Sequence, residues 1–192
     1  MERCTVWENL RIEVGGYGDY LALAGFHYRT GRPGVVRRVF VARWARGSDE
    51  MLAGVVVESM PVLACRLRDA ALPGRYACGG DRRAAARLLN REMRVISRLV
   101  VHPTFRGVGV GVALVSRVLE TATTPYVEAL AAMGRVHPVF ERAGMRAYWP
   151  EDAGPTGEAR WRVVGRPVYY LWSREWEFTT ETQRHRGCTE TA

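Results

Sequence analysis

The stretch that decides the fold is RVISRLVVHPTFRGVGVGVALVSRVL, residues 94–119. Its first part, residues 95–101, is rich in β-branched and apolar side chains, which is typical of a largely buried strand. From Val108 to Leu119 apolar residues recur at i, i+4, i+7 and i+11, the spacing of one helix face. A helix is therefore expected to begin inside the glycine-rich turn 106–111.

The turn Arg106-Gly107-Val108-Gly109-Val110-Gly111 has the composition of an anion cradle. Glycines let the backbone approach a ligand closely, and a new helix N-terminus presents unpaired N–H groups to phosphate oxygens. The sequence thus predicts a diphosphate site. A Walker loop is disfavoured because the chain has no lysine. A dinucleotide fingerprint is disfavoured by the glycine spacing and by the position past mid-chain. The turn could also serve only to join strand and helix.

The following residues repeat the alternation of strand and helix. Residues 126–131 are expected to form a strand, and residues 136–145 a short helix that ends at Gly144. Together with the turn, these segments resemble the acyl-CoA-binding core of the GNAT superfamily of N-acetyltransferases. The resemblance is clearest over residues 94–150 and extends, less specifically, to about residue 175.

Two short fragments resemble one subgroup of that superfamily. They are Gly25-Phe26-His27-Tyr28-Arg29 and Ala131-Ala132-Met133-Gly134-Arg135-Val136-His137-Pro138. The subgroup comprises acyltransferase-like domains fused to ABC-type ATPases and relatives of the phage Mom DNA-modification protein. The narrower resemblance implies a nucleobase acceptor in DNA or RNA, and an ABC-type ATPase as a partner.

Composition limits the class of protein. The chain has 192 residues, 47% of them hydrophobic, enough for one packed domain. No apolar stretch approaches the ~20 residues that span a bilayer, and the N-terminus lacks a signal-peptide core, so a cytoplasmic protein without membrane contact is expected. The four cysteines form no CxxC pair, so reduced thiols are expected. The net charge of +8, carried by arginine, suits an acidic partner such as nucleic acid.

The sequence predicts a single α/β (α+β) domain over residues 1–177. The resemblance implies the GNAT fold for it, a mixed, mostly antiparallel central sheet flanked by helices. Besides the segments above, strands are expected at residues 10–14, 35–44, 52–61 and 167–172, and a helix at residues 19–24. An insertion over about residues 61–93 precedes the central strand and contains a helix capped by Asp81. The tail 178–192 is polar and expected to be disordered.

The resemblance implies that the central strand is splayed from its neighbour, and that its free backbone groups pair with the pantetheine arm of acetyl-CoA or another acyl-CoA. An N–H near Val100 or Val101 would polarise the thioester carbonyl, a fixed-dipole effect typically worth about 3 kcal/mol. An ordinary buried strand is the alternative. The residues expected to bind the donor are Leu99, Val100, Val101, Arg106, Gly107, Val108, Gly109, Val110, Gly111 and Phe140.

The acid and base are less clear, because the sequence departs from the family pattern. Phe140 stands where the family's tyrosine commonly protonates the leaving thiolate, and Val95 where a carboxylate is often found. The candidate catalytic residues are His27, Tyr28, Ser97, Glu128 and His137. Glu58 is a weaker candidate than Glu128, and the alternative interpretation of His102 is that it shapes a turn. A metal site of His27, Glu128 and His137 has no ligand-spacing signature, so no metal is predicted.

The leading function is transfer of an acyl group from acyl-CoA to a nitrogen nucleophile, with a nucleobase as one possible acceptor. A small molecule or a protein amine is the alternative acceptor. The rival from another class is a catalytically silent domain that binds CoA for sensing, or that supports an ATPase partner. Loss of the usual tyrosine and carboxylate motivates this rival.

Overall fold

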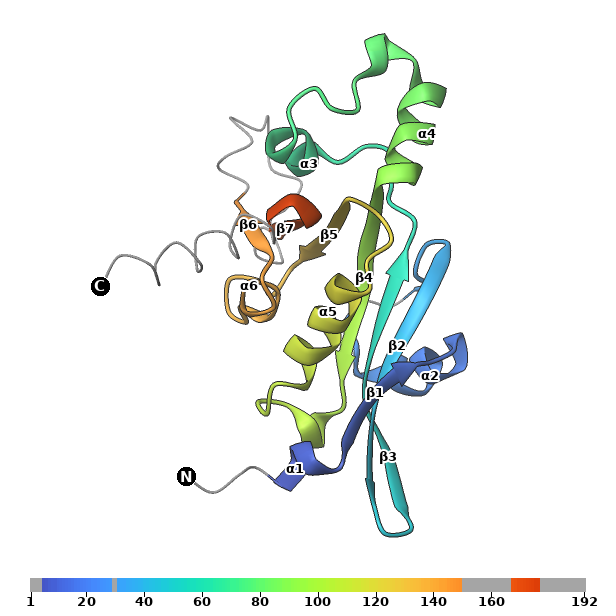
Figure 1. The fold of residues 1–192 in the computed structure, drawn as a ribbon, viewed down its shortest axis with the longest axis vertical. Coiled ribbons are helices and arrows are strands. Elements are labelled where there is room, and N and C mark those ends of the chain that lie inside the picture. The colour runs from blue at the N-terminus through green and yellow to red at the C-terminus, as the bar shows by residue number, and fades with distance from the viewer. Residues whose placement is uncertain (1–4, 29–30, 150–166, 177–192) are drawn as a thin grey trace, which may run out of the picture.

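The computed structural model describes residues 5–28, 31–149 and 167–176. These form a seven-stranded sheet in the order β1-β2-β3-β4-β5-β7-β6 (Figure 1). Within the described residues β4 and β5 pair in parallel and all other neighbours are antiparallel. The strands are β1 (Leu10–Val14), β2 (Val36–Arg46), β3 (Asp49–Ser59), β4 (Met93–Val101), β5 (Tyr126–Ala131), β6 (Arg146–Tyr148) and β7 (Val168–Ser173). The mixed, mostly antiparallel sheet confirms the predicted fold class.

Helices cover both faces of this sheet (Figure 1). They are α1 (Thr5–Glu8), α2 (Tyr17–Leu23), α3 (Arg66–Ala71), α4 (Arg82–Glu92), α5 (Val110–Glu120) and α6 (Val139–Arg142), with short 3-10 turns η1 (Ala24–Phe26), η2 (Cys78–Gly80) and η3 (Pro103–Phe105). Side chains alternate between the faces of a strand. Val56 of β3 accordingly packs in the core under α5, whereas Val55 and Val57 pack under α2.

Helix α5 lies close against the sheet because β3 has a glycine beneath it. A Cβ at Gly54 would lie 3.0 Å from Leu114 Cδ1 and 3.1 Å from Val110 Cγ1, both on α5. A larger residue would push the helix outward. The buried valines and leucines of α5 then complete the largest core cluster with Phe40 and Ile96, and burial of such side chains is the main stabilising term.

The insertion forms its own layer at the end of the sheet away from the glycine-rich turn (Figure 1). Asp81 caps α4 as predicted, because its carboxylate accepts from the amides of Arg83 (2.8 Å) and Ala84 (3.1 Å). Leu89 of α4 packs with Met93, Tyr169 and Leu171 of the sheet. The insertion therefore packs on the sheet face that also carries α2.

One predicted helix is shorter in the structure. The helix expected over residues 136–145 covers only Val139–Arg142, because Pro138 disfavours helical backbone at His137 and cannot donate an N–H. Its expected end at Gly144 is confirmed, with a φ of 97°. The α5 helix begins at Val110, inside the glycine-rich turn as predicted, because Gly107 and Gly109 both have positive φ. The predicted tail lies outside the described residues.

Within the described part of the chain, no helix has the length and apolar character required to cross a membrane.

Candidate functional site

The central feature is an opening between β4 and β5. Met93 to Ile96 pair with Tyr126 to Ala129, but beyond Ile96 the two strands separate. Among the described strands, residues 97–101 then have only β3 as a neighbour. Leu130 reflects this opening: it lies within β5 opposite the buried Tyr169, yet it is 44% exposed. The central strand is thus splayed from its parallel neighbour, as the resemblance implied.

A bulge at Ser97 marks the point where the opening begins. The register pairs Val57 with Arg98 and Glu58 with Ile96, so Ser97 is an extra residue on β4. Its hydroxyl lies 2.7 Å from that of Ser59 and donates to the Val57 carbonyl (3.2 Å). Bulges often redirect side chains next to a functional site. The Ser97 hydroxyl, a candidate catalytic group, is engaged in holding this bulge.

The alternation of backbone bonds shows which residues face the opening. The His102 amide donates to the Ala53 carbonyl (2.9 Å). Hydrogen-bonded pairs alternate along an antiparallel ladder, so the next such pairs toward the start of β4 are Val100 with Val55 and Arg98 with Val57. The N–H and C=O groups of Leu99 and Val101 therefore point away from β3, toward the opening. Of the two amides predicted to polarise a thioester, that of Val101 faces the opening and that of Val100 faces β3.

The glycine-rich turn forms a cradle at the end of this opening. Gly107 has a φ of 82° and Gly109 a φ of 93°, the left-handed region that favours glycine. Gly109 is the N-cap of α5 and supplies no side chain to its first turn. Among the described residues, no acceptor pairs with the amides of residues 107–112. These N–H groups and the positive end of the helix dipole favour an anion.

Arg106 and Gly111 join the cradle to the opening. The Arg106 Nε donates to the Val101 carbonyl (3.2 Å), which ties the turn to the end of β4 and leaves the side chain exposed. A Cβ at Gly111 would lie 3.4 Å from Val139 Cγ1, 3.5 Å from Val101 Cγ2 and 3.7 Å from Leu99 Cδ2. These are ordinary contacts. Packing among the described residues therefore does not explain the glycine at this position.

Trp7 of α1 supports the cradle from outside. Its Nε1–H donates to the Val108 carbonyl (3.0 Å), and its ring lies 3.2 Å from where a Cβ of Gly109 would be. The N–H of Gly109 belongs to the same peptide plane and points the opposite way, so Trp7 orients one of the cradle amides. Sequence reasoning missed this residue, because no local pattern connects positions 101 residues apart.

The predicted histidines lie in loops. His27 follows η1 and stacks on Tyr28, with ring centroids 4.7 Å apart, and Tyr28 is 56% exposed. His137 is exposed in the turn between β5 and α6, where its amide donates to the Met133 carbonyl (2.9 Å). The His102 ring accepts from the Thr104 amide and so shapes a turn. In the described part of the chain, no three His, Cys, Asp or Glu side chains are grouped to hold a metal.

Glu128 is buried in a fully paired network at the closed end of the opening. Arg68 of α3 donates to both carboxylate oxygens (2.8 and 2.6 Å), and the Tyr169 hydroxyl adds a third bond (2.8 Å). Burial and the neighbouring carboxylate raise the pKa of Tyr169. Arg68 also donates to two carbonyls of the insertion. Attachment of the insertion to the sheet accounts for Glu128 without a catalytic role.

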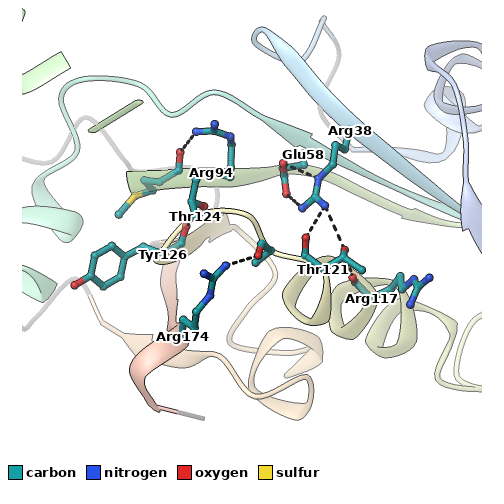
Figure 2. A network of polar contacts seen from close by, with 10 residues as sticks. Arg38, Glu58, Arg94, Arg117, Thr121, Thr124, Tyr126 and Arg174 are labelled. Atoms are coloured by element: carbon teal, nitrogen blue, oxygen red, sulfur yellow. Dashed lines mark hydrogen bonds and ion pairs between the residues drawn. The ribbon is translucent and has the colours of Figure 1, made fainter. Parts of the chain in front are cut away.

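Glu58 is likewise bound by an arginine, on the opposite face of the sheet. The Nε and Nη2 groups of Arg38 donate to its two oxygens (3.1 and 2.6 Å), and Nη1 donates to the Thr121 carbonyl (2.7 Å). Figure 2 shows Arg38 between Glu58 of β3 and Thr121 at the end of α5. This second buried carboxylate therefore fixes the C-terminal end of α5.

Phe140, which stands in place of the family's tyrosine, is stacked on another tyrosine. The rings of Phe140 and Tyr170 lie 5.0 Å apart, and the Tyr170 hydroxyl donates to the Gly134 carbonyl (3.3 Å). Burial, and then the nearby Glu141 carboxylate, raise the pKa of Tyr170 to about 12, so the phenol stays protonated at neutral pH. Sequence reasoning placed Tyr170 on a strand but did not single it out, because its proximity to Phe140 arises only in the fold.

The sequence matches no protein-family model, and no curated protein matches it. The structure resembles spermidine/spermine N-acetyltransferase SpeG from Vibrio cholerae, with a TM-score of 0.53 and 10% identity over 90% of this chain and 97% of that chain. It also aligns with a Bacillus subtilis acetyltransferase in complex with CoA (TM-score 0.46, 16% identity, 85% and 98% of the two chains). A third similar structure is a KacTA–DNA complex (TM-score 0.49, 13% identity, 91% and 99%).

At such identities a shared fold is established and a shared activity is not. The likeness to SpeG extends over nearly the whole of both chains. It agrees with the splayed parallel strands and with the glycine turn that opens α5. The chain has the fold of the GNAT N-acetyltransferases.

Proposed function

We propose that this protein transfers an acyl group from acyl-CoA to a nitrogen nucleophile, as a single catalytic domain over residues 1–177. The observation that carries the proposal is the opening between β4 and β5, followed by a turn whose amides pair with no acceptor in the described part of the chain. The diphosphate of the donor would bind at residues 107–112, and its pantetheine arm would pair with Leu99 and Val101 in the opening. Acetyl-CoA is the simplest such donor.

The reaction needs three tasks from the protein. The acceptor nitrogen attacks the thioester carbonyl, a C–N bond forms, and the C–S bond breaks to release the CoA thiol. The Val101 N–H is aimed into the opening and would stabilise the oxyanion. The acceptor must lose a proton, for which His27 and His137 have the suitable chemistry. Tyr170 is a protonated phenol beside Phe140 and is a candidate to return a proton to the thiolate.

The finer part of the proposal is a nucleobase acceptor. The net charge of +8 and the exposed arginines of α4 favour contact with phosphates, and the short Mom-like fragments favour modification of DNA or RNA. An ABC-type ATPase partner rests on those fragments alone. None of the structures named above is a Mom-like protein. The acceptor of SpeG is a polyamine, spermidine or spermine, so a small-molecule amine is the second candidate.

The rival function is a silent domain that binds CoA without transfer. Both buried carboxylates near the sheet centre, Glu58 and Glu128, are taken up by arginines, which favours this rival. Two measurements separate the functions. Calorimetry with CoA tests the cradle, and release of free thiol from a panel of acyl-CoA donors tests transfer. Binding without thiol release on any acceptor would favour the silent domain, and no binding would contradict the donor assignment.

The nucleobase acceptor has its own test. Binding of duplex DNA should weaken with salt by a log–log slope of about −0.9 per phosphate contact. Replacing Arg82, Arg83 and Arg87 with glutamine should flatten that slope without changing CoA affinity. Because a base must leave the stack to react, single-stranded or mismatched sites should react faster. Failure to bind DNA or RNA at ~50 mM salt would leave a small molecule or a protein amine as the acceptor.

A further inference from the structure

Arg98 of β4 is a buried cation without a carboxylate partner among the described residues. It is 9% exposed and forms none of the described ion pairs. Its Nη1 donates to the Ser97 carbonyl (2.7 Å) and its Nη2 to the Gly31 carbonyl (3.2 Å). Its Nε–H is buried and makes no hydrogen bond to any described residue. Burying a charge without an opposite charge is costly.

Two other arginines, Arg68 and Arg38, bind buried carboxylates through the Nε–Nη2 edge of the guanidinium. Arg68 presents Nε and Nη2 to Glu128 at 2.8 and 2.6 Å, and Arg38 presents the same pair to Glu58 at 3.1 and 2.6 Å. This fork matches the geometry of a carboxylate or a phosphate. On Arg98 the same fork carries only the 3.2 Å contact to a carbonyl, which is at the long end of the usual range.

The bulge at Ser97 decides where Arg98 points. Leu99 and Val101 pack on the α5 side, whereas Val100 packs under α2. Arg98 shares the face of Val100, and it contacts the segment that follows α2 through Gly31. Leu130 borders the opening on this same face. Arg98 therefore lies at the opening, on the face opposite the cradle side of the sheet.

We propose that Arg98 binds an anionic group, a carboxylate or a phosphate, on the acceptor molecule. This inference rests on the proposed acyltransferase function. The donor would occupy the cradle and the α5 side of the opening, and the acceptor would enter from the face that carries α2. The Nε–Nη2 fork of Arg98 would hold the acceptor's oxyanion beside the opening, and so position its nitrogen toward the thioester. The acceptor class is an amine that also carries a carboxylate or a phosphate.

The probes are inorganic phosphate and acetate, added at constant ionic strength to the full chain saturated with CoA, which fills the cradle. An anion that binds the folded protein raises its Tm. We expect one or both anions to raise the Tm of the wild type. In Arg98→Gln the apparent Kd of that anion should rise about 10- to 100-fold, the effect of losing a charged hydrogen-bonded pair. Phosphate alone, or acetate alone, would identify the acceptor's group.

Two further variants keep the test decisive. Arg98→Lys retains the charge but lacks the fork, so it should bind the anion with intermediate affinity. Arg11→Gln removes one exposed positive charge on β1 and should behave as wild type. Only the anion-dependent change in Tm is compared, so a variant of lower stability remains informative.

Equal anion response in wild type and Arg98→Gln would overturn the proposal, and so would a wild type that responds to neither anion. Failure of the acyltransferase function would appear differently, as no CoA binding by calorimetry. The anion titration is then repeated with Gly109→Asp alone and with Gly109→Asp combined with Arg98→Gln, because Gly109→Asp blocks the cradle. This comparison tests anion binding at Arg98 without CoA.

Discussion

The two halves of β4 differ in whether the polar groups on and around them have partners within the protein. Where β4 is closed against β5, the nearby buried charges are all paired: Glu128 with Arg68, and Glu58 with Arg38. Where β4 is open, the amides of Leu99 and Val101 face no strand, and Arg98 keeps a free Nε–H among the described residues. Buried polar groups are normally satisfied within the protein. The open half departs from this rule, which is why the proposed ligand site is placed there rather than at the buried carboxylates.

Among the variants proposed, we expect a substitution of Arg68, in the closed half, to reduce stability most. Arg68→Met leaves Glu128 buried without its cation, which should lower the free energy of unfolding by about 3–5 kcal/mol. Urea denaturation measures the change. Arg66→Met, an exposed arginine on the same helix, is the matched control and should cost less than about 0.5 kcal/mol.

A second variant distinguishes the cost of leaving Glu128 charged and unpaired from the cost of the packing lost with Arg68. Replacing both partners, Arg68→Met with Glu128→Leu, should recover much of the stability, because an apolar pair of similar volume replaces the ion pair. The CoA affinity of the folded protein should be unchanged in all these variants. A loss of less than about 1 kcal/mol in Arg68→Met would show that the insertion is attached by other contacts.

The open half is tested at Gly109. Gly109→Asp places a carboxylate at the N-terminus of α5, where the diphosphate would lie, and its φ of 93° adds strain. The Kd for CoA, measured by calorimetry, should rise by at least about 100-fold. Gly47→Asp carries the same change at a positive φ of 63° in the β2–β3 turn, with nothing within 4 Å, and should bind CoA normally. Equal affinity in both variants would remove the cradle from the site.

Tyr170 gives a pH-dependent test at the boundary of the site. Its pKa is raised to about 12, so the folded state favours the neutral phenol. Below pH 10 the phenol is neutral in both folded and unfolded chains, and its contribution to stability is complete. As pH rises from 10 to 12 the unfolded chain ionises first, so the stability of the wild type should fall by about 2–3 kcal/mol more than that of Tyr170→Phe.

Chemical denaturation of both proteins across this pH range isolates the Tyr170 effect, because other tyrosines titrate alike in the two. Parallel curves would contradict the raised pKa. If transfer is observed, a lower kcat in Tyr170→Phe with unchanged CoA affinity would support Tyr170 as the proton donor to the thiolate.

The parts of the fold that sequence predicted are those with local signals. The strand 95–101, the glycine turn and α5 follow from periodicity and from positions that need positive φ, and Asp81 was recognisable as a helix cap. The cause of the shorter α6 is also local, because Pro138 disfavours helical backbone at the residue before it.

The site depended on contacts that no local pattern records. Sequence could name Glu128 as a candidate base, but only the fold shows that Arg68, 60 residues away, occupies it. Likewise, the bulge at Ser97 decides which face Arg98 and Leu99 take, and a one-residue shift is invisible in an apolar run. The resemblance predicted that β4 is splayed from β5. The structure shows which backbone groups then face the opening: those of Leu99 and Val101 rather than that of Val100.

The smallest expected effect concerns Trp7, which supports the open half from outside. Its Nε1–H bond to the Val108 carbonyl holds the peptide plane that carries the Gly109 N–H. Trp7→Phe keeps an aromatic ring near Gly109 and removes only this donor. Since one hydrogen bond contributes about 0.5–1.5 kcal/mol, the Kd for CoA should rise roughly 2- to 13-fold, while the free energy of unfolding changes little because Trp7 is 42% exposed. Trp176→Phe, which alters a tryptophan near Arg146 and far from the cradle in sequence, is the control and should leave CoA binding unchanged. A Trp7→Phe protein that binds CoA as wild type does would show that the glycines alone fix the cradle, and that the open half needs no support from α1.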